Sequence, residues 1–351
     1  MALSKLDRRR FLLGSASMGA MALTPGIAKA TSPKSILANN ITIDTHGHPG
    51  IMLNRPGVFD DAEESGITAI TASAAADSPA RLHGSKTNFR ATQPGELYGH
   101  TRDLIDNARD VLEDRNTLIA KSIKEILSAK KNKKMACILA VEGGDFAEGR
   151  MEAIEEFYNK GVRLIQPVHD RPNLFGDSQR GTDKGDLTGD GKQFIKELNR
   201  LGIVCDVAHM TKKGTQLAAE TINDPLILSH ALHLNRPSVR MRRFKRVSDH
   251  EHQKIVVETG GLLGIWGLRL SSKMLGLVGA DSQKAFVLNQ FKFLADLYGV
   301  DHICLGTDIG GLKGYEGWLD DYSKLTDLAE GLQGVGFKDD EIIKMLGGNF
   351  M

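Results

Sequence analysis

The sequence predicts a (β/α)8 barrel, and three observations indicate it. Eight short runs rich in Val, Ile and Leu recur along the 351 residues, as expected for parallel strands that are covered on both faces. Segments with helical periodicity separate these runs, so strands and helices alternate. Most of the runs carry one polar, ligand-type residue at the C-terminal end, and a barrel brings such strand ends together at one mouth. A long doubly wound sheet is the alternative with the same alternation.

The predicted strands span residues 41–46, 67–73, 135–142, 162–169, 203–209, 226–230, 262–266 and 303–308. Helices are expected near residues 101–131, 148–160, 190–201, 212–222, 248–259, 281–298 and 322–333. One of these helices begins with the capping box Ser248-Asp249-His250-Glu251 and ends at Gly260-Gly261. Over 60 residues separate the second strand from the third, so we expect an active-site insertion at about 75–100.

The first thirty residues differ from the rest of the chain. Asp7-Arg8-Arg9-Arg10-Phe11-Leu12-Leu13 resembles a twin-arginine export signal, and Ala28-Lys29-Ala30 has the small residues of a cleavage site. A membrane anchor is the alternative, but the intervening stretch contains glycine and proline and falls short of ~20 apolar residues. We therefore expect a cleaved signal over residues 1–30, recognised by the twin-arginine (Tat) machinery. The barrel domain would span residues 31–351 and would be periplasmic or otherwise exported.

Composition restricts the partners. The chain is 41% hydrophobic and 25% charged, which is ordinary for a globular protein. Residues 1–30 carry five Lys or Arg side chains and one Asp, so their removal changes the formal net charge from +1 to −3. Nothing in this balance indicates a nucleic-acid-binding protein. The three cysteines lie in apolar runs and are expected to be buried thiols. A homodimer is one assembly that the sequence allows.

The polar residues at the predicted strand ends are of the types that bind metal ions. They are His46, His48, Glu142, His169, His209, His230 and Asp308. Imidazoles and carboxylates suit Zn²⁺ or a similar divalent ion, and a metal would offset the cost of burying so many ionisable groups. Two ions would need a bridging carboxylate, for which Glu142 is placed, and a hydroxide between them would be the nucleophile. Asp308 is a natural general base.

Seven motifs follow one another along the chain. They are Asp44-Thr45-His46-Gly47-His48; Glu142-Gly143-Gly144; Gly161-Val162-Arg163 with His169, Asn173 and Asp177-Ser178; Leu198-Asn199-Arg200-Leu201-Gly202 with Asp206-Val207-Ala208-His209; Ser229-His230; Gly306-Thr307-Asp308; and Leu346-Gly347-Gly348-Asn349-Phe350. In this order they resemble the motifs of the membrane (renal-type) dipeptidases, peptidase family M19, among the amidohydrolase-like metal-dependent hydrolases. The resemblance runs from about residue 41 to the C-terminus.

The resemblance implies a zinc dipeptidase with a binuclear site, acting on a dipeptide or a similar small substrate. His46 and His48 would hold the first ion, His209 and His230 the second, and Glu142 would bridge the two. His169 would hydrogen-bond the substrate or the tetrahedral intermediate. Asp308, also a candidate metal ligand, would take the proton of the attacking water and pass it to the leaving amine.

The sequence departs from the family pattern in two places. The family usually has Asp at the position of His48, so the site here is more positive, which should make a bridging water more acidic. The family also has an arginine that binds the substrate carboxylate, and Arg240, Arg243 and Arg246 are all candidates for it. Hydrolysis of another amide, an ester or a lactone therefore remains an alternative. A non-catalytic metal- or ligand-binding barrel is a further alternative, but such a protein needs no general base.

Overall fold

The computed structural model describes residues 31–53, 57–82, 88–181, 185–235, 237–238, 240–241, 244–312, 314 and 316–351. Residues 31–351 form one compact unit. The expected export signal, His83 in the expected insertion, and Arg243 all lie outside the described residues. Among the residues described, no helix is both long and apolar enough to cross a membrane.

Eight parallel strands form a closed barrel. They are β1 (Ile43–Asp44), β2 (Ala69–Ala75), β4 (Ala136–Glu142), β5 (Val162–Gln166), β6 (Val204–Cys205), β7 (Ile227–His233), β9 (Leu262–Ile265) and β10 (Ile303–Leu305). Their order around the sheet is β6-β5-β4-β2-β1-β10-β9-β7. A parallel bridge between Asp206 and Ile227 joins β6 to β7 and closes the ring. The predicted (β/α)8 barrel is confirmed, and the doubly wound alternative is excluded.

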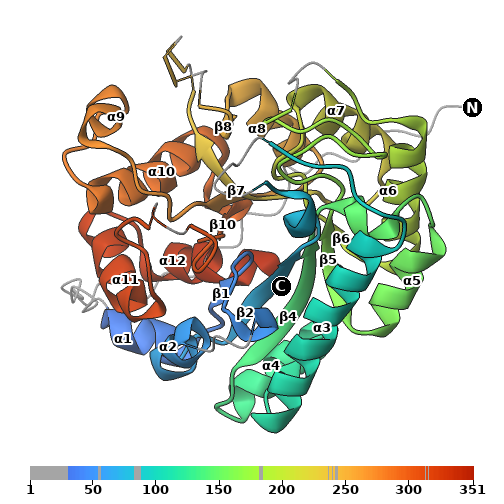
Figure 1. The fold of residues 1–351 in the computed structure, drawn as a ribbon. Coiled ribbons are helices and arrows are strands. Elements are labelled where there is room, and N and C mark those ends of the chain that lie inside the picture. The colour runs from blue at the N-terminus through green and yellow to red at the C-terminus, as the bar shows by residue number, and fades with distance from the viewer. Residues whose placement is uncertain are drawn as a thin grey trace, which may run out of the picture. The chain divides into compact units, whose positions relative to one another are not determined.

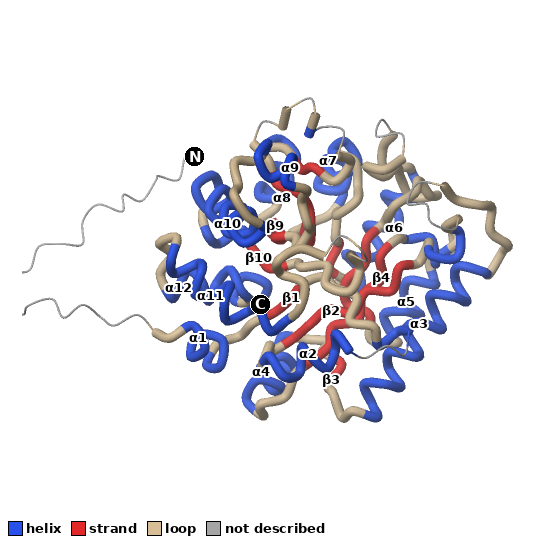
Figure 2. Tube along the Cα trace, turned by 60° about the vertical axis from the view of Figure 1, so that its left-hand side comes forward, coloured by secondary structure: helices blue, strands red, loops and turns tan. Residues whose placement is uncertain are grey.

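Helices surround this ring of strands, as Figures 1 and 2 show. Those that follow the strands in turn are α2 (Gly57–Ser65), α3 (Glu96–Asp114), α4 (Ile123–Lys131), α5 (Glu152–Asn159), α6 (Gly189–Leu201), α7 (Lys212–Thr221), α8 (His250–Glu258), α10 (Gln283–Tyr298), α11 (Leu325–Gly334) and α12 (Asp339–Leu346). The remaining two are α1 (Pro33–Asn39) and α9 (Ser272–Leu277). Side-chain caps fix several helix starts; for example, the hydroxyl of Thr211 accepts a hydrogen bond from the backbone N–H of Gly214 at the start of α7.

Three sequence expectations about the elements were wrong. The strands expected over residues 41–46, 162–169, 203–209 and 303–308 end two to four residues earlier, so His46, His169, His209 and Asp308 follow their strands rather than end them. The single helix expected over residues 101–131 is two helices, α3 and α4, with a short strand β3 (Leu118–Ile119) between them. α3 ends at Asp114, and two residues later Asn116 has a φ of 53°, in the left-handed region, where a helix cannot continue. In addition, His230 does not end its strand, because β7 continues to His233 by pairing with β8 (Val247–Ser248).

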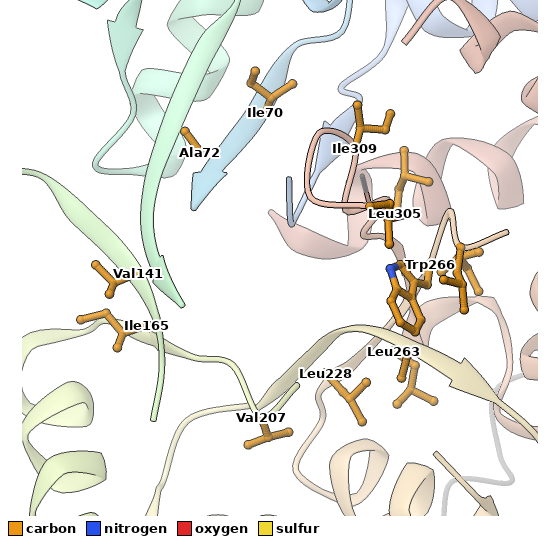
Figure 3. Close-up of a cluster of buried hydrophobic side chains, with 14 of the residues drawn as sticks. Ile70, Ala72, Val141, Ile165, Val207, Leu228, Leu263, Trp266, Leu305 and Ile309 are labelled. Atoms are coloured by element: carbon orange, nitrogen blue, oxygen red, sulfur yellow. The ribbon is translucent and has the colours of Figure 1, made fainter. Parts of the chain in front are cut away.

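The two faces of each barrel strand differ in what they contact. Side chains such as Ile70, Val141, Ile165 and Leu228 belong to the main core beneath the helices, and Figure 3 shows them around the ring. The alternate positions belong to two separate small clusters, one of which extends onto α4 through Ile126 and Ala129. The strand residues in these clusters are Ile43, Ala69, Ala136, Ile138, Ala140, Leu164, Ile227 and Cys304. This alternation has the period of two expected for a strand. The three cysteines are buried and free, as expected.

The inner face becomes polar toward the C-terminal ends of the strands. Following the inner positions along each strand leads to Ser73 on β2, Glu142 on β4, Gln166 on β5, and Asp206 and Ser229 after β6 and on β7. All five are buried. Burying polar groups is costly unless they are paired, so this layer marks the place where the barrel departs from simple core packing.

Candidate metal centre

The carboxylate of Glu142 lies at the centre of a cluster of histidines at the C-terminal end of the barrel. Its Oε1 is 3.0 Å from Nε2 of His209, 3.5 Å from Nε2 of His46 and 3.7 Å from Nε2 of His230. The rings of His46 and His230 are stacked, with centroids 4.0 Å apart. Three buried imidazoles, one on β7 and two on the segments that follow β1 and β6, thus face one carboxylate oxygen.

The second oxygen of the Glu142 carboxylate faces two more histidines. Its Oε2 is 3.3 Å from Nε2 of both His48 and His169. Oδ1 of Asp308 completes this side, at 3.5 Å from Nε2 of His48. Every residue that the strand-end pattern selected therefore lies in one cluster.

Hydrogen bonds from the polar inner layer orient the histidines. Nδ1 of His46 is 3.3 Å from Oγ of Ser73 and 3.4 Å from Nε2 of Gln166. Nδ1 of His230 is 2.9 Å from Oγ of Ser229. In both rings Nδ1 is engaged and Nε2 is turned toward Glu142. Such supporting bonds fix the ring orientation and the tautomer of metal-binding histidines.

Burial sets the protonation of the cluster. It lowers the pKa of His209 to about 4 and holds the pKa values of His46 and His230 well below the usual range. These rings are therefore neutral near pH 7, which is the form that binds metal ions. Burial alone would raise the pKa of Glu142, but the surrounding histidines hold it well below its ordinary value, so this carboxylate is ionised.

The donor set fits a divalent transition metal such as zinc. Nε2 of His46 is buried and has no hydrogen-bond partner, which is unfavourable unless a ligand takes its lone pair. Four groups of three side chains place ligand atoms within 4.8 Å of one another. They are His46, His48 and Glu142; Glu142, His209 and His230; His46, Asp206 and His230; and His169, Asp170 and His209. The first two groups share Glu142, and neutral imidazoles with a carboxylate are typical zinc ligands.

Asp308 is held by a residue that the sequence analysis missed. Its Oδ2 accepts a hydrogen bond of 3.0 Å from the indole N–H of Trp266. Burial raises the pKa of Asp308 to about 6, so this carboxyl can take up and release a proton near neutral pH. Trp266 comes directly after β9 and closes the predicted strand 262–266, so the strand-end rule could have selected it.

Two residues of the cluster have unusual backbone conformations. His209 has a φ of 69° and Asp308 a φ of 60°, both in the left-handed region. Each lies a few residues beyond the end of its strand, β6 or β10. Such conformations cost about 1–3 kcal/mol each and persist where the surrounding structure enforces them. Both bends turn side chains that follow short strands back over the barrel mouth.

A cavity of about 490 Å³ opens over the cluster. This volume lies within the usual range for small-molecule sites. Of the three arginines considered for substrate binding, Arg246 lines the cavity and is buried, whereas Arg240 is exposed and is not part of the lining. From the expected insertion, Ser78, Arg81 and His100 line the cavity.

Arg246 is fixed beside the histidines by β8. Because Leu232 on β7 pairs with Val247 on β8, Arg246 lies next to His230, and its Nη2 donates a 2.8 Å hydrogen bond to the His230 carbonyl. Its Nη1 is 2.6 Å from Nε2 of His209, and its guanidinium lies 4.8 Å from the centroid of the Trp266 ring. Burial lowers the pKa of Arg246 to about 10, so it still carries its charge near pH 7.

A second group of charged residues lines the cavity near Arg246, and the sequence did not predict it. Asp77 lies 2.7 Å from Nδ1 of His169, and Asp170 pairs with both Arg81 and Arg180. Asp170 directly follows His169, which the strand-end pattern selected, so its position in the sequence could have predicted that it lies at the site. Asp77, Arg81 and Arg180 lie on irregular segments, where no periodic pattern distinguishes them.

Comparison with known proteins agrees with this arrangement. Residues 63–351 match the family model of the membrane dipeptidases, peptidase family M19. The chain belongs to this family. The expected resemblance is therefore confirmed, and the protein is a metal-dependent peptidase of the dipeptidase family.

Individual relatives of this M19 protein are distant. An uncharacterised protein from the pqqA 5′ region of Klebsiella pneumoniae is 26% identical over 237 residues, which cover 66% of this chain and 85% of that protein. Dipeptidase verJ of Clonostachys rogersoniana is 28% identical over 273 residues, covering 76% of this chain and 67% of that protein. A solved metallopeptidase from Rhodobacter sphaeroides, liganded with a phosphinate mimic of the dipeptide L-Ala-D-Ala, is 20% identical with a TM-score of 0.74. The match covers 89% of this chain and 97% of that one, and it shows the shared fold.

Proposed function

We propose that this M19 protein is an exported binuclear zinc dipeptidase, which hydrolyses the single peptide bond of a dipeptide. The observation that carries the proposal is the position of Glu142. It belongs to two groups of potential ligands at once, one with His46 and His48 and the other with His209 and His230. A carboxylate shared in this way is what two neighbouring metal ions require.

In this proposal His46 and His48 would hold one zinc ion, His209 and His230 would hold the other, and Glu142 would be a ligand shared by both groups. Asp308 is close enough to His48 to contribute an oxygen ligand as well. When bound, the two ions supply a water of lowered pKa, hydroxide at neutral pH, and polarisation of the peptide carbonyl. His48 replaces the carboxylate that is usual in the family, so the site keeps one negative charge fewer.

The remaining residues bind the substrate and move the proton. Burial alone would lower the pKa of His169, but the carboxylates of Asp77, Glu142 and Asp170 raise it to about 10. His169 is therefore a charged hydrogen-bond donor that faces the cavity and can stabilise negative charge developing on the carbonyl oxygen. Asp308 accepts the proton of the attacking water at its carboxylate and returns it to the leaving amine.

In the same proposal Arg246 binds the C-terminal carboxylate of the substrate. It is a buried, charged guanidinium on the cavity wall, and an arginine can bind a carboxylate with two parallel hydrogen bonds. A dipeptide presents its C-terminal carboxylate one residue from the scissile bond, whereas a longer peptide does not. Pairing of Arg246 with this carboxylate would therefore favour substrates of two residues over longer peptides.

The test of the function is a comparison of dipeptides with neutral substrates. Zinc-loaded protein is assayed on a panel of dipeptides, dipeptide amides and lactones, and Arg246→Ala is assayed beside it. We expect hydrolysis of dipeptides by the wild type, and a KM roughly 10- to 100-fold higher in Arg246→Ala because a charge-assisted pair is lost. Amides and lactones should show little change in KM, and Arg246→Lys should restore binding only in part.

Arg240→Ala is the matched control, because it removes the same charge from an exposed position outside the cavity. Hydrolysis of lactones or simple amides in preference to every dipeptide would refute the dipeptidase proposal and favour the alternative substrate class. Metal binding without turnover of any substrate would favour the non-catalytic alternative. Equal KM values for dipeptides in Arg246→Ala and the wild type would exclude Arg246 as the carboxylate ligand.

The export part of the proposal rests on the sequence of residues 1–30. The double substitution Arg8→Lys and Arg9→Lys should leave the protein in the cytoplasm, because the twin-arginine pair is read by the export machinery as an address. Fractionation of cells expressing the wild type should place the shortened chain in the periplasm. A wild-type chain that keeps its N-terminus and stays in the cytoplasm would show that residues 1–30 are not an export signal.

A further inference from the structure

Arg81 and Arg180 form a pair of cations on the cavity wall, joined by one carboxylate. Nη2 of Arg81 lies 2.9 Å from Oδ2 of Asp170, and Nε of Arg180 lies 2.7 Å from Oδ1 of the same residue. All three line the cavity over the histidine cluster. Asp170 is nearly buried, whereas the side chains of Arg81 and Arg180 are 28% and 21% exposed, so both guanidinium groups remain accessible from the cavity.

This pair is adjacent to Arg246. Oδ1 of Asp170, which contacts Arg180, is also 3.4 Å from Nδ1 of His209, and Nη1 of Arg246 is 3.2 Å from the same nitrogen. Arg180 and Arg246 are therefore connected through two atoms only, Oδ1 of Asp170 and Nδ1 of His209. Burial is the largest cause that lowers the pKa of Arg246, and the positive charge of Arg180 is the second. The two guanidinium groups are therefore close enough to repel each other.

Three guanidinium groups lie close together on this wall of the cavity. Asp170 contacts both Arg81 and Arg180, and Asp77 lies 3.8 Å from Arg81 but closer, 2.7 Å, to His169. The carboxylates of Asp170, Glu142 and Asp308 act on the charge of Arg246. A second carboxylate on a substrate could pair with the accessible sides of Arg81 and Arg180, which a substrate with a single carboxylate bound at Arg246 would not contact.

We propose that Arg81 and Arg180 form a second anion subsite beside Arg246, which selects dipeptides whose C-terminal residue is Asp or Glu. The inference rests on the proposed function, in which Arg246 binds the α-carboxylate of that residue. A C-terminal Asp or Glu carries its second carboxylate only two or three carbon atoms from the first. Two adjacent cationic positions suit such a pair of carboxylates, whereas an acidic side chain on the N-terminal residue would point away from Arg246.

The test compares acidic substrates with their neutral isosteres. The kcat/KM of the zinc-loaded wild type is measured for Ala-Asp, Ala-Asn, Ala-Glu and Ala-Gln, each with the C-terminal residue in the L and the D form. We expect Asp and Glu to exceed Asn and Gln by roughly 10- to 100-fold in the preferred form, since a charge-assisted contact is gained. Arg180→Met should lower kcat/KM for Ala-Asp and Ala-Glu far more than for Ala-Asn and Ala-Gln, and so reduce the ratio toward one.

Three comparisons separate selectivity from a structural role. Arg81→Met should also reduce the ratio, Arg180→Lys should keep part of it, and the exposed Arg240→Met should leave it unchanged. If Arg180 only holds Asp170 against His209, Arg180→Met would lower kcat/KM equally for acidic and neutral substrates. An unchanged Asp-to-Asn ratio in both Arg81→Met and Arg180→Met would overturn the proposal.

Calorimetric binding of the free amino acids aspartate and asparagine distinguishes failure of the subsite from failure of the proposed function. Tighter binding of aspartate by the wild type, lost in Arg180→Met, supports the subsite even if no dipeptide is cleaved. Efficient cleavage of Ala-Asn and Ala-Asp at equal rates, with equal binding of the two amino acids, removes the subsite and leaves the dipeptidase proposal standing.

Discussion

Asp308→Asn is expected to lower kcat for dipeptides by roughly 10²–10⁴-fold, the usual range for loss of a general acid–base group. The amide of Asn cannot accept the proton of the attacking water, but it keeps the shape of the carboxyl. Asn also tolerates the left-handed conformation that residue 308 adopts, with a φ of 60°, so the variant should fold. The hydrogen bond from the Trp266 indole can be kept by the amide oxygen.

The measurement is kcat at saturating zinc and dipeptide, together with the metal content of the purified variant. Asp320→Asn is the matched control, since Asp320 is exposed and does not line the cavity. Trp266→Phe should lower kcat less than Asp308→Asn does, because it frees the Asp308 carboxylate without removing it. Near-normal kcat in Asp308→Asn with normal metal content would exclude Asp308 as the proton carrier.

Glu142→Gln is expected to abolish the paired metal site. The purified wild type should carry close to two zinc equivalents per chain, in keeping with two ligand groups that share this residue. Loss of a supporting hydrogen bond near a metal already costs roughly 10–100-fold in affinity, so loss of a shared direct ligand should cost more for both ions. The neutral amide would also leave the three surrounding buried histidines without the anion that they face.

Zinc content after dialysis, measured by elemental analysis, and activity after zinc is added back decide this prediction. The variant should retain fewer than one equivalent, and Glu220→Gln, an exposed substitution of the same kind, should retain the wild-type content. If Glu142→Gln keeps two equivalents, Glu142 does not connect the ions. If the wild type itself binds one ion and no more, the histidine at position 48, where the family usually has Asp, does not support the metal position shared with His46.

The barrel and the centre of its site could be predicted because both follow from period-two strands. In a barrel the C-terminal ends of all strands meet, so one rule selected Glu142 on β4, His230 on β7 and Asp308 after β10 without any knowledge of distances. The same rule could not tell where pairing stops. β7 continues past His230 because β8 adds to it, and that contact joins segments separated by a loop.

Residues on irregular segments could not be found in this way. Arg81, Asp77 and Arg180 follow β2 and β5 at positions that only the folded loops define, and nothing in their local sequence separates them from surface charges. The choice among the three candidate arginines was equally out of reach. The backbone pairing of β8 buries Arg246 and the loop leaves Arg240 exposed, although both belong to one basic run.

The arginines and the histidines of the cavity belong to different parts of the framework. Glu142 and His230 lie on barrel strands, whereas Arg81, Arg180 and Arg246 each come from a separate connecting segment. Evolution can therefore change substrate specificity by altering one such segment while the metal-binding and proton-transfer residues stay the same. For protein engineers the same division suggests exchanging the segments that carry Arg81 and Arg180 together, because both arginines contact Asp170.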